Sequence, residues 1–425
     1  MPPQLFDSEL CVKCRGRGFC NKPCKIYSKI KDFIPKTKTH FSGSSPPEIF
    51  VGRFNYPNIS AGILAPDSSE SANTNIESSA LNNAELITQM SFPEEWHRQN
   101  LSIEQILTNR AKLIYGRFKT QIKSPKQNNN KFIGIMQEIS MAYKPVSTEF
   151  FLKKPPIMKL ELNRHSAAIG NPAPLERARF QENPKIKPKV EYLVSDTDNK
   201  AASSILELYK YQITNSNIIK ILSAGLLGLK TQRKLVPTRW SITAVDDTIS
   251  KNLLKKIKYY PEINEILLFH GYYVGNHYEI LLLPDKFSFE VLEAYMPGSL
   301  WNIASGTSLS QDFERFSPRK YYADSVTGAY YTMRLALCEY LERIKRQAYC
   351  IVFREERPEY YAPLGVGILR QLAREAFSKQ PEKFNTISEA LQQSQTRLKL
   401  PVEVFTSKSV LLKEYKQQAR LGNWF

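Results

Sequence analysis

Apolar and polar positions follow strand and helix periods most clearly in the second half of the chain. Residues 263–295 contain three apolar runs, broken at VGN and LPD, and this pattern predicts an antiparallel meander. Residues 326–348 predict a long amphipathic helix, 349–355 a strand, and the segment that begins at Pro363 another helix, with that proline near its first turn. Because strands and helices do not alternate strictly, the pattern predicts an α+β fold in which helices flank an antiparallel sheet.

Three shorter elements are predicted just before this region. EYLV at 191–194 suits a short buried strand, and SSILELYKYQI at 203–213 is typical of a helix capped by Ser203 or Ser204. A second helix is predicted at 216–227, where glycines provide a stop. Two short helices joined by TNSN match a helix-turn-helix, but they equally match an ordinary packing pair.

The glycines after this second helix do not form a phosphate-binding loop. AGLLGLKTQRK contains Gly225, Gly228, Lys230 and Thr231, which are the residue types that such a loop uses. A P-loop needs Gly directly before Lys, after a strand, whereas here Leu229 intervenes and the preceding segment is predicted to be helical. A helix C-cap is the simpler interpretation.

The length of 425 residues allows two or three domains. A polar Ser- and Asn-rich stretch interrupts the first third of the chain and predicts a loop insertion. The predicted organisation is a zinc-binding module at 1–40, an N-terminal region at 41–140 with the insertion at 66–92, a main α+β domain at 141–405, and a C-terminal helix and tail at 406–425.

The charge balance favours a polyanionic partner. Lys and Arg number 59 against 41 Asp and Glu, which gives a net charge of +18 and a pI near 9.4. The same excess of positive charge would also fit binding to an anionic membrane surface, or a role in keeping the protein soluble. The sequence contains neither an apolar run of about twenty residues nor a leader-like N-terminus, so we expect a cytoplasmic, nucleoid-associated protein without a membrane partner.

Four of the six cysteines form one cluster, Cys11, Cys14, Cys20 and Cys24, with the spacing C-x2-C-x5-C-x3-C. Two close pairs of thiolates suit one tetrahedral Zn²⁺, and four protein ligands would make that zinc structural, at one ion per chain. An iron–sulfur cluster would use the same ligands, and two disulfides are the remaining alternative. Several basic side chains lie among the cysteines, including Arg15 and Arg17, which makes phosphate contact a plausible use of this module.

Two further groups of residues have the types that nucleic-acid chemistry uses. Arg239 and Trp240, in VPTRWSI, offer a guanidinium and a ring to a nucleotide, although a core Trp beside a surface Arg is the commoner case. Two acidic pairs would hold Mg²⁺ for phosphodiester hydrolysis if the fold brought them together. These pairs are Asp196 with Asp198 and Asp246 with Asp247. Their spacing is not diagnostic, because Asp also forms turns and caps helices.

The C-terminal tail carries an apolar motif at Gln418, Leu421, Trp424 and Phe425, with the pattern Q-x-x-h-x-x-a-a. In one 3₁₀ turn, residues three apart lie on the same face, so Leu and Trp would form an apolar plug with Phe beside them. The glutamine amide would remain at its rim. A partner pocket for this plug is one interpretation; the other is that the aromatic residues fold back on the protein's own core.

This tail closely resembles the box by which replication and repair proteins bind the sliding clamp, PCNA. Between the four-Cys module and the tail lie PPEIFVGRFNYP, VEYLVSDTDNKA, SAGLLGLKTQRKLVPTRWSITAVDD, EAYMPGSLWN and YYAPLGVGILRQLAREAF. With these segments the chain resembles the archaeal Nre family of DNA repair proteins over nearly its whole length, apart from 66–92 and a loop near residue 124.

The resemblance implies a DNA repair factor whose four cysteines bind zinc and whose terminal motif contacts the clamp. It also implies action alongside nucleotide-excision repair proteins on bulky or crosslinked lesions. Trp424 stands where many clamp-binding boxes carry Phe or Tyr, which changes the fit to the pocket. The family provides no catalytic mechanism, so a metal-dependent nuclease or nucleotide-processing hydrolase using the four aspartates remains the main alternative. An RNA- or ribosome-associated factor is a third.

Overall fold

The structure of the protein is a computed structural model, and it describes residues 24, 28, 38–66, 87–88, 90–126, 131–157, 165–302 and 306–417. Backbone packing divides the chain into two compact units. The N-terminal unit contains the described parts of Cys14–Ile249 together with Ala362–Ile368, and the C-terminal unit contains those of Ser250–Tyr361 and Leu369–Phe425. The predicted main domain at 141–405 therefore draws on both units.

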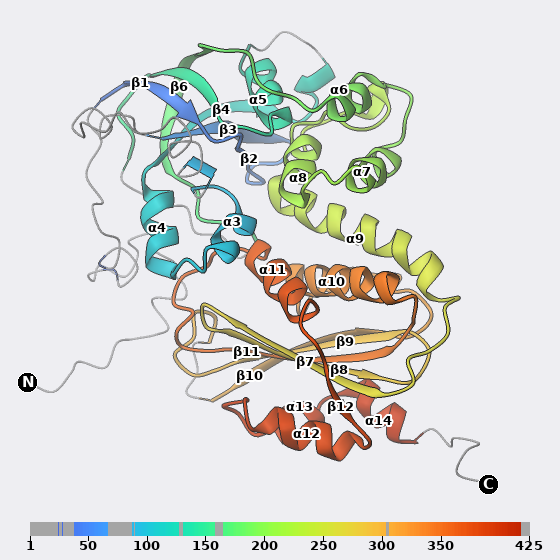
Figure 1. The fold of residues 1–425 in the computed structure, drawn as a ribbon. Helices are drawn as coiled ribbons and strands as arrows, with labels where there is room; N and C mark the ends of the chain where they lie inside the picture. Colours follow the sequence, from blue (N-terminus) through green and yellow to red (C-terminus); the bar gives the residue numbers. More distant parts are fainter. Residues whose placement is uncertain are drawn as a thin grey trace, which may run out of the picture. The chain divides into compact units, whose positions relative to one another are not determined.

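A mixed six-stranded sheet forms the centre of the N-terminal unit (Figure 1). Its strands are β1 (His40–Ser45), β2 (Ile49–Val51), β3 (Asn58–Pro66), β4 (Leu113–Gln121), β5 (Val146–Leu152) and β6 (Asn171–Phe180). In the sheet they lie in the order β1-β5-β6-β4-β3-β2, and every neighbouring pair is antiparallel except β4 and β6. Strands β5 and β6 lie between β1 and β4, so strands that are far apart in the sequence are neighbours in the sheet.

The helices that accompany this sheet are α3 (Pro93–Arg98), α4 (Ile103–Ala111), α5 (Lys131–Met141), α6 (Pro188–Ser195), α7 (Ala201–Lys210), α8 (Asn215–Ser223) and α9 (Thr238–Ile257), with 3₁₀ turns η3 (Ser124–Lys126) and η4 (Lys230–Gln232). Helices α4, α5 and α8 contact strands of the sheet, and α9 continues into the C-terminal unit from Ser250 onward. Local sequence explains several helix starts: Ser102 and Gln105 form a capping box on α4, and the Thr214 side chain accepts from the Asn217 N–H of α8.

The predicted strand at 191–194 is wrong, because these residues lie in α6. Pro188 begins that helix, and Val190 and Leu193 are buried one turn apart on its inner face. The helix predicted at 203–213 is present, but it begins earlier, with Lys200 rather than a serine as N-cap.

The helix predicted at 216–227 is confirmed as α8. It ends at Ser223 and is followed by Gly225 in the left-handed region at φ 72°, as expected of a helix stop. Of the nine residues of α8, eight are buried, and Ser216 is half-buried. A DNA-reading helix must expose a face to the major groove, so the α7–α8 pair is a packing pair.

The C-terminal unit contains a second mixed six-stranded sheet. Its strands are β7 (Ile266–Tyr273), β8 (Asn276–Leu283), β9 (Ser288–Tyr295), β10 (Ser308–Glu314), β11 (Tyr349–Glu356) and β12 (Glu382–Phe384), in the order β10-β9-β11-β8-β7-β12. The three strands predicted within 263–295 are confirmed, but they do not form a meander. β11 lies between β8 and β9, antiparallel to the first and parallel to the second.

Helices cover both faces of this second sheet (Figure 1). They are α10 (Gly328–Ile344), α11 (Gly367–Ala376), α12 (Ile387–Gln395), α13 (Glu403–Thr406) and α14 (Val410–Gln417). Phe353 of β11 stacks on Phe405 of α13 at 5.0 Å, and on the other face Phe289 of β9 contacts Tyr330 of α10 at 4.9 Å. Coverage on both sides explains why every position of β8, β9 and β11 is buried.

The expected fold class is therefore confirmed as α+β, with two mixed sheets in place of one antiparallel sheet. The helix and strand predicted at 326–348 and 349–355 correspond to α10 and β11. Pro363 lies before α11, which begins at Gly367, and not in its first turn. Within the described part of the chain, no helix combines the length and apolar character needed to cross a membrane.

Candidate nucleic-acid interface

The turn between β2 and β3 lies beside the first turn of α9 in the N-terminal unit. The backbone N–H of Val51, at the end of β2, donates to Oγ1 of Thr238, at the start of α9, over 3.0 Å. Inside the turn, Asn55 adopts φ 61°, a left-handed conformation that asparagine tolerates, and its carbonyl accepts from the N–H of Asn58 at 2.8 Å. The first bond holds the turn against the helix, and the second closes the turn itself.

Two aromatic rings meet at this junction and remain exposed to solvent. Tyr56 from the turn and Trp240 from α9 have ring centroids 5.4 Å apart, at an interplanar angle of 56°. Each of the two residues is 44% exposed, and Phe54 in the same turn is 71% exposed. Large apolar rings are mostly buried in folded proteins, so this concentration of exposed rings indicates a binding surface.

Arginines flank the rings. The guanidinium of Arg53 lies over the ring of Phe54, 5.2 Å from its centroid. Arg239 is half-buried, and its Nη2 donates to Nε2 of the buried His165 at 3.2 Å. Because a guanidinium can only donate, this imidazole nitrogen is the acceptor and carries no proton. The hydrogen bond orients Arg239 next to Trp240.

We call Arg53, Phe54, Tyr56, Arg239 and Trp240 the aromatic surface. Exposed rings that stack on unpaired bases, flanked by cations that bind phosphates, are the usual components of a site for single-stranded nucleic acid. Sequence reasoning identified the last two residues and missed the first three. The available signal was a pair of aromatic residues in a polar turn between a glycine and a proline, PPEIFVGRFNYP.

A second exposed group of cations and rings lies in the same unit, around α6. Lys189 of α6 lies 4.8 Å from the ring centroid of Tyr192 and 4.6 Å from that of Tyr211. A hydrogen bond to Glu207 raises the pKa of Lys189, which therefore stays charged at neutral pH. Tyr143, just after α5, has two more lysine ammonium groups within 6 Å of its ring, those of Lys144 and Lys187. We call these three lysines and three tyrosines the lysine–tyrosine surface. The charge of Lys189 is offset by its ion pair with Glu207, so the positive charge of this surface comes from the two lysines at Tyr143.

A buried cation lies inside the same unit. Lys220 of α8 is 5% exposed, its Nζ donates to the carbonyl of Pro47, and it lies 4.5 Å from the ring centroid of Phe92. Burial lowers its pKa to about 8, and the nearby carboxylates of Glu48 and Glu94 only partly oppose that shift. The lysine joins the β1–β2 connection to α8 and to the residue before α3.

In the structure, the aspartates of both predicted acidic pairs lie in or beside helices, and two of them make hydrogen bonds that stabilise the fold. Asp196 caps the end of α6: its Oδ1 accepts from the N–H of Asp198 at 3.1 Å, and its carbonyl accepts from Arg233 at 2.8 Å. This arrangement is a turn that closes a helix, which is a common use of aspartate.

The second acidic pair lies on α9. Asp246 is fully buried and accepts from Nδ2 of Asn215 at 3.2 Å, which ties α9 to α8, and Asp247 is half-buried. Among all described residues, no three His, Cys, Asp or Glu side chains form a group that would hold a metal ion. The four aspartates are therefore not brought together as the nuclease alternative requires.

The predicted zinc and clamp residues lie mostly outside the described residues. This applies to Cys11, Cys14, Cys20, Arg15 and Arg17, and to the terminal motif at Gln418, Leu421, Trp424 and Phe425. Cys24 is described and half-buried, and its carbonyl accepts from the N–H of Ser28 at 2.9 Å. The motif follows α14 directly, since that helix ends at Gln417.

Comparison with known proteins gives one consistent family. The archaeal Nre N-terminal family matches residues 19–302 and the archaeal Nre C-terminal family matches residues 314–424. The chain is 33% identical to DNA repair protein NreB of Archaeoglobus fulgidus, over 96% of this chain and 98% of that protein. It is 32% identical to DNA repair protein NreA of Haloferax volcanii, over 82% and 81% respectively. No solved structure matches the chain significantly.

Proposed function

The chain belongs to the archaeal Nre family, and from that premise we propose that it is a DNA repair factor that binds unpaired DNA through its aromatic surface. Its relatives in Archaeoglobus fulgidus and Haloferax volcanii are named as DNA repair proteins. We therefore take DNA as the ligand. The exposed rings can stack on the bases that a bulky or crosslinking lesion displaces from the duplex.

The contact between Tyr56 and Trp240 is the observation that supports this proposal most strongly. The two rings lie together in a fixed position, yet each residue remains 44% exposed. Stacking of a base on such a ring stabilises a complex by about 1–3 kcal/mol and is independent of sequence, because every base has a flat face. A repair factor that meets lesions in any sequence context needs this kind of contact.

Net charge supports the same conclusion. The chain carries +18, and two of its lysines, Lys144 and Lys187, lie together at Tyr143 in the unit that holds the aromatic surface. Each phosphate that a lysine or arginine neutralises releases counterions, which favours binding at moderate salt. We propose that cations track the phosphates and that the rings detect exposed bases.

The terminal motif supplies localisation in this proposal. Gln418, Leu421, Trp424 and Phe425 would bind the PCNA sliding clamp, and the four-Cys module would bind one structural zinc ion and contact DNA. A chain held by the clamp binds DNA as an intramolecular event, so weak contacts at the aromatic surface suffice. Nucleotide-excision repair proteins would act beside it on the same lesions.

A titration of the full chain against labelled DNA tests the proposal. The probes are a single strand, an undamaged duplex, a duplex with a bulky adduct, and a single-stranded RNA of the same sequence. We expect tighter binding to the single strand and to the adducted duplex than to the intact duplex. Tighter binding to RNA, with no response to the clamp, would instead indicate an RNA-associated factor.

Hydrolysis distinguishes the enzymatic alternative from the proposal. The adducted duplex is incubated with the protein and Mg²⁺ or Mn²⁺, and the products are separated by size. We expect binding without cleavage, because the described structure does not bring the four aspartates into one metal group. Cleavage that Asp196→Ala abolishes in a folded protein would contradict this expectation.

A further inference from the structure

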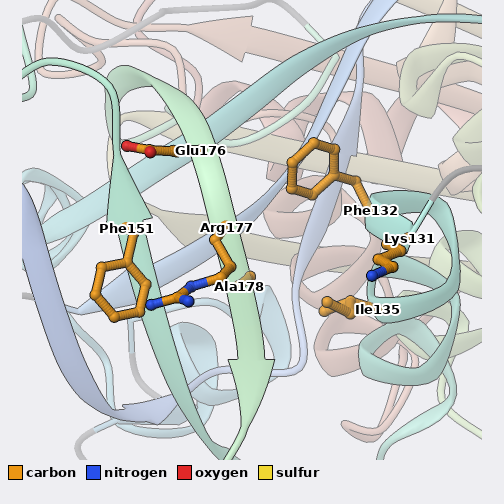
Figure 2. A pocket seen from close by; sticks show the side chains of 7 residues that line it. All are labelled: Lys131, Phe132, Ile135, Phe151, Glu176, Arg177 and Ala178. Atoms are coloured by element: carbon orange, nitrogen blue, oxygen red, sulfur yellow. The ribbon is translucent and has the colours of Figure 1, made fainter.

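A pocket of about 610 Å³ opens between α5 and the strands β5 and β6 of the N-terminal unit (Figure 2). Helix α5 contributes Lys131, Phe132 and Ile135, and the strands contribute Phe151, Glu176 and Arg177. Pockets of about 300–1,000 Å³ with apolar walls and a few polar groups are typical of small-molecule sites. None of these residues belongs to the aromatic surface.

Three consecutive residues of β6, Glu176, Arg177 and Ala178, line this pocket, and a β-bulge lies among them. Phe151 of β5 pairs with Arg177, whereas the next residue, Leu152, pairs with Leu175. Glu176 is therefore an extra residue in β6, and both it and Arg177 are exposed instead of pointing to opposite faces. Bulges that redirect a side chain in this way are common next to functional sites.

Stacking holds the guanidinium of Arg177 in place. It lies 4.0 Å from the ring centroid of Phe151, and the His40 ring stacks on the same phenyl ring at 4.4 Å and 11°. Because β5 lies between β1 and β6, His40 and Arg177 approach Phe151 from opposite sides. A guanidinium held over a ring still has N–H donors that can bind an anion.

Two cations, Arg177 and Lys131, line the pocket against one carboxylate, that of Glu176. Among the described residues, no carboxylate forms an ion pair with either Arg177 or Lys131. The nearby Glu149 pairs instead with Arg179 and His40, and these contacts lower its pKa. Figure 2 shows Lys131, Phe132 and Ile135 of α5 on one side of the pocket and Phe151, Glu176 and Arg177 on the other, with the guanidinium of Arg177 beside the Phe151 ring. Two cations, one carboxylate and four apolar side chains thus surround one space.

We propose that this pocket binds a single nucleotide unit. Arg177 and Lys131 bind its phosphate, since a guanidinium and an ammonium group are the usual protein partners of this anion. The base packs against Phe132 and Ile135. Glu176 accepts a hydrogen bond from an exocyclic amine of the base or from a sugar hydroxyl. A free nucleotide and a nucleotide of a single strand share this chemistry.

The inference goes beyond the proposed function, because a nucleotide would bind here whether or not the aromatic surface binds DNA. Isothermal titration of the full chain with dAMP, with deoxyadenosine and with a short oligo(dA) strand tests it. We expect dAMP or oligo(dA) to bind, and deoxyadenosine, which lacks the phosphate, to bind at least tenfold more weakly. If dAMP binds, a free nucleotide is a sufficient ligand. If oligo(dA) binds and dAMP does not, the ligand is a nucleotide within a single strand.

Variants locate the binding. Arg177→Gln and Lys131→Ala should each weaken it at least tenfold without changing the melting temperature, whereas Lys210→Ala, an exposed lysine on α7, should leave it unchanged. Lys131→Ala serves as the test if Arg177→Gln fails to fold. Binding that neither variant weakens, or no binding of either ligand, overturns the inference. Oligo(dA) binding that Trp240→Ala weakens and Arg177→Gln does not would overturn it while supporting the proposed function.

Discussion

The ring of Tyr56 lies against the ring of Trp240, with centroids 5.4 Å apart, although one comes from the β2–β3 turn and the other from α9. The hydrogen bond from Val51 to Thr238 fixes the two segments next to each other. The pair is thus a product of the tertiary fold. Its exposure gives the N-terminal unit a rigid surface for stacking, on which the account of function depends.

The arginines beside these rings should contribute through charge. We expect Arg53→Ala and Arg239→Ala each to weaken the binding of a single-stranded oligonucleotide. Each variant should also reduce the slope of log Kd against log salt concentration by about 1, because one phosphate contact is lost. The measurement is a titration at several salt concentrations. Lys210→Ala is the matched control and should keep the wild-type slope; unchanged slopes in both arginine variants would remove them from the interface.

Deletion of Gln418–Phe425 should abolish co-elution with the sliding clamp and leave the melting temperature nearly unchanged. The reason for the second expectation is that α14 packs through Leu411, Leu412 and Tyr415, which all precede the deletion. Size-exclusion chromatography and a thermal melt measure the two effects. A large loss of stability would show that the tail packs on the protein's own core.

Metal analysis should find about one zinc ion per chain, lost in Cys14→Ser, because four thiolates complete the coordination of one ion. Cys338→Ala is the control, since this thiol is buried in α10, outside the proposed module. Iron in place of zinc, with visible absorbance, would reassign the four-Cys module to an iron–sulfur cluster.

Lys220 should make stability depend on pH. Its pKa is lowered from 10.5 to about 8 in the folded protein, so between these values the unfolded chain holds a proton that the native state has lost. The free energy of unfolding therefore rises with pH between these two pKa values. One pKa unit corresponds to about 1.36 kcal/mol, so the total rise is about 3 kcal/mol. The Lys220→Met variant should lack this rise.

Urea unfolding of the wild type and of Lys220→Met at pH 7, 8.5 and 10 measures this contribution. Other lysines and tyrosines also titrate there, so the difference between the two proteins is the relevant quantity. Lys210→Met, at an exposed position, should follow the wild-type profile. Parallel profiles for wild type and Lys220→Met would show that the buried amine keeps an ordinary pKa.

Hydrophobic patterning predicted the longest elements well and the shortest ones poorly. Helix α10 and strand β11 have long regular patterns and are confirmed. The segment 191–194 fits a strand as well as a helix, because it has only four residues and two aliphatic side chains. The helix start at Pro188 is the signal that decides between them. The order of the second sheet was not predictable from local pattern, because β8, β9 and β11 are buried at every position and their sequences fit any central place.

The candidate site was predictable only in part, for a similar reason. Arg239 and Trp240 are neighbours in sequence, so their chemistry is visible there, whereas Tyr56 joins them only through the packing of β2 on α9. The pocket at Arg177 depends on a register shift between β5 and β6, which alternation along one strand does not show. Contacts between distant segments are what the sequence pattern leaves undetermined.

The most direct test of DNA binding by the aromatic surface is the Kd for a labelled single strand, measured by fluorescence anisotropy on three folded proteins. These are the wild type, Tyr56→Ala/Trp240→Ala, and Tyr259→Ala, whose residue is 90% exposed but belongs to the C-terminal unit. Loss of the paired rings should raise the Kd by about tenfold or more, since stacking contributes about 1–3 kcal/mol per base, and Tyr259→Ala should bind as the wild type does. A double variant that binds as tightly as the wild type would contradict the account.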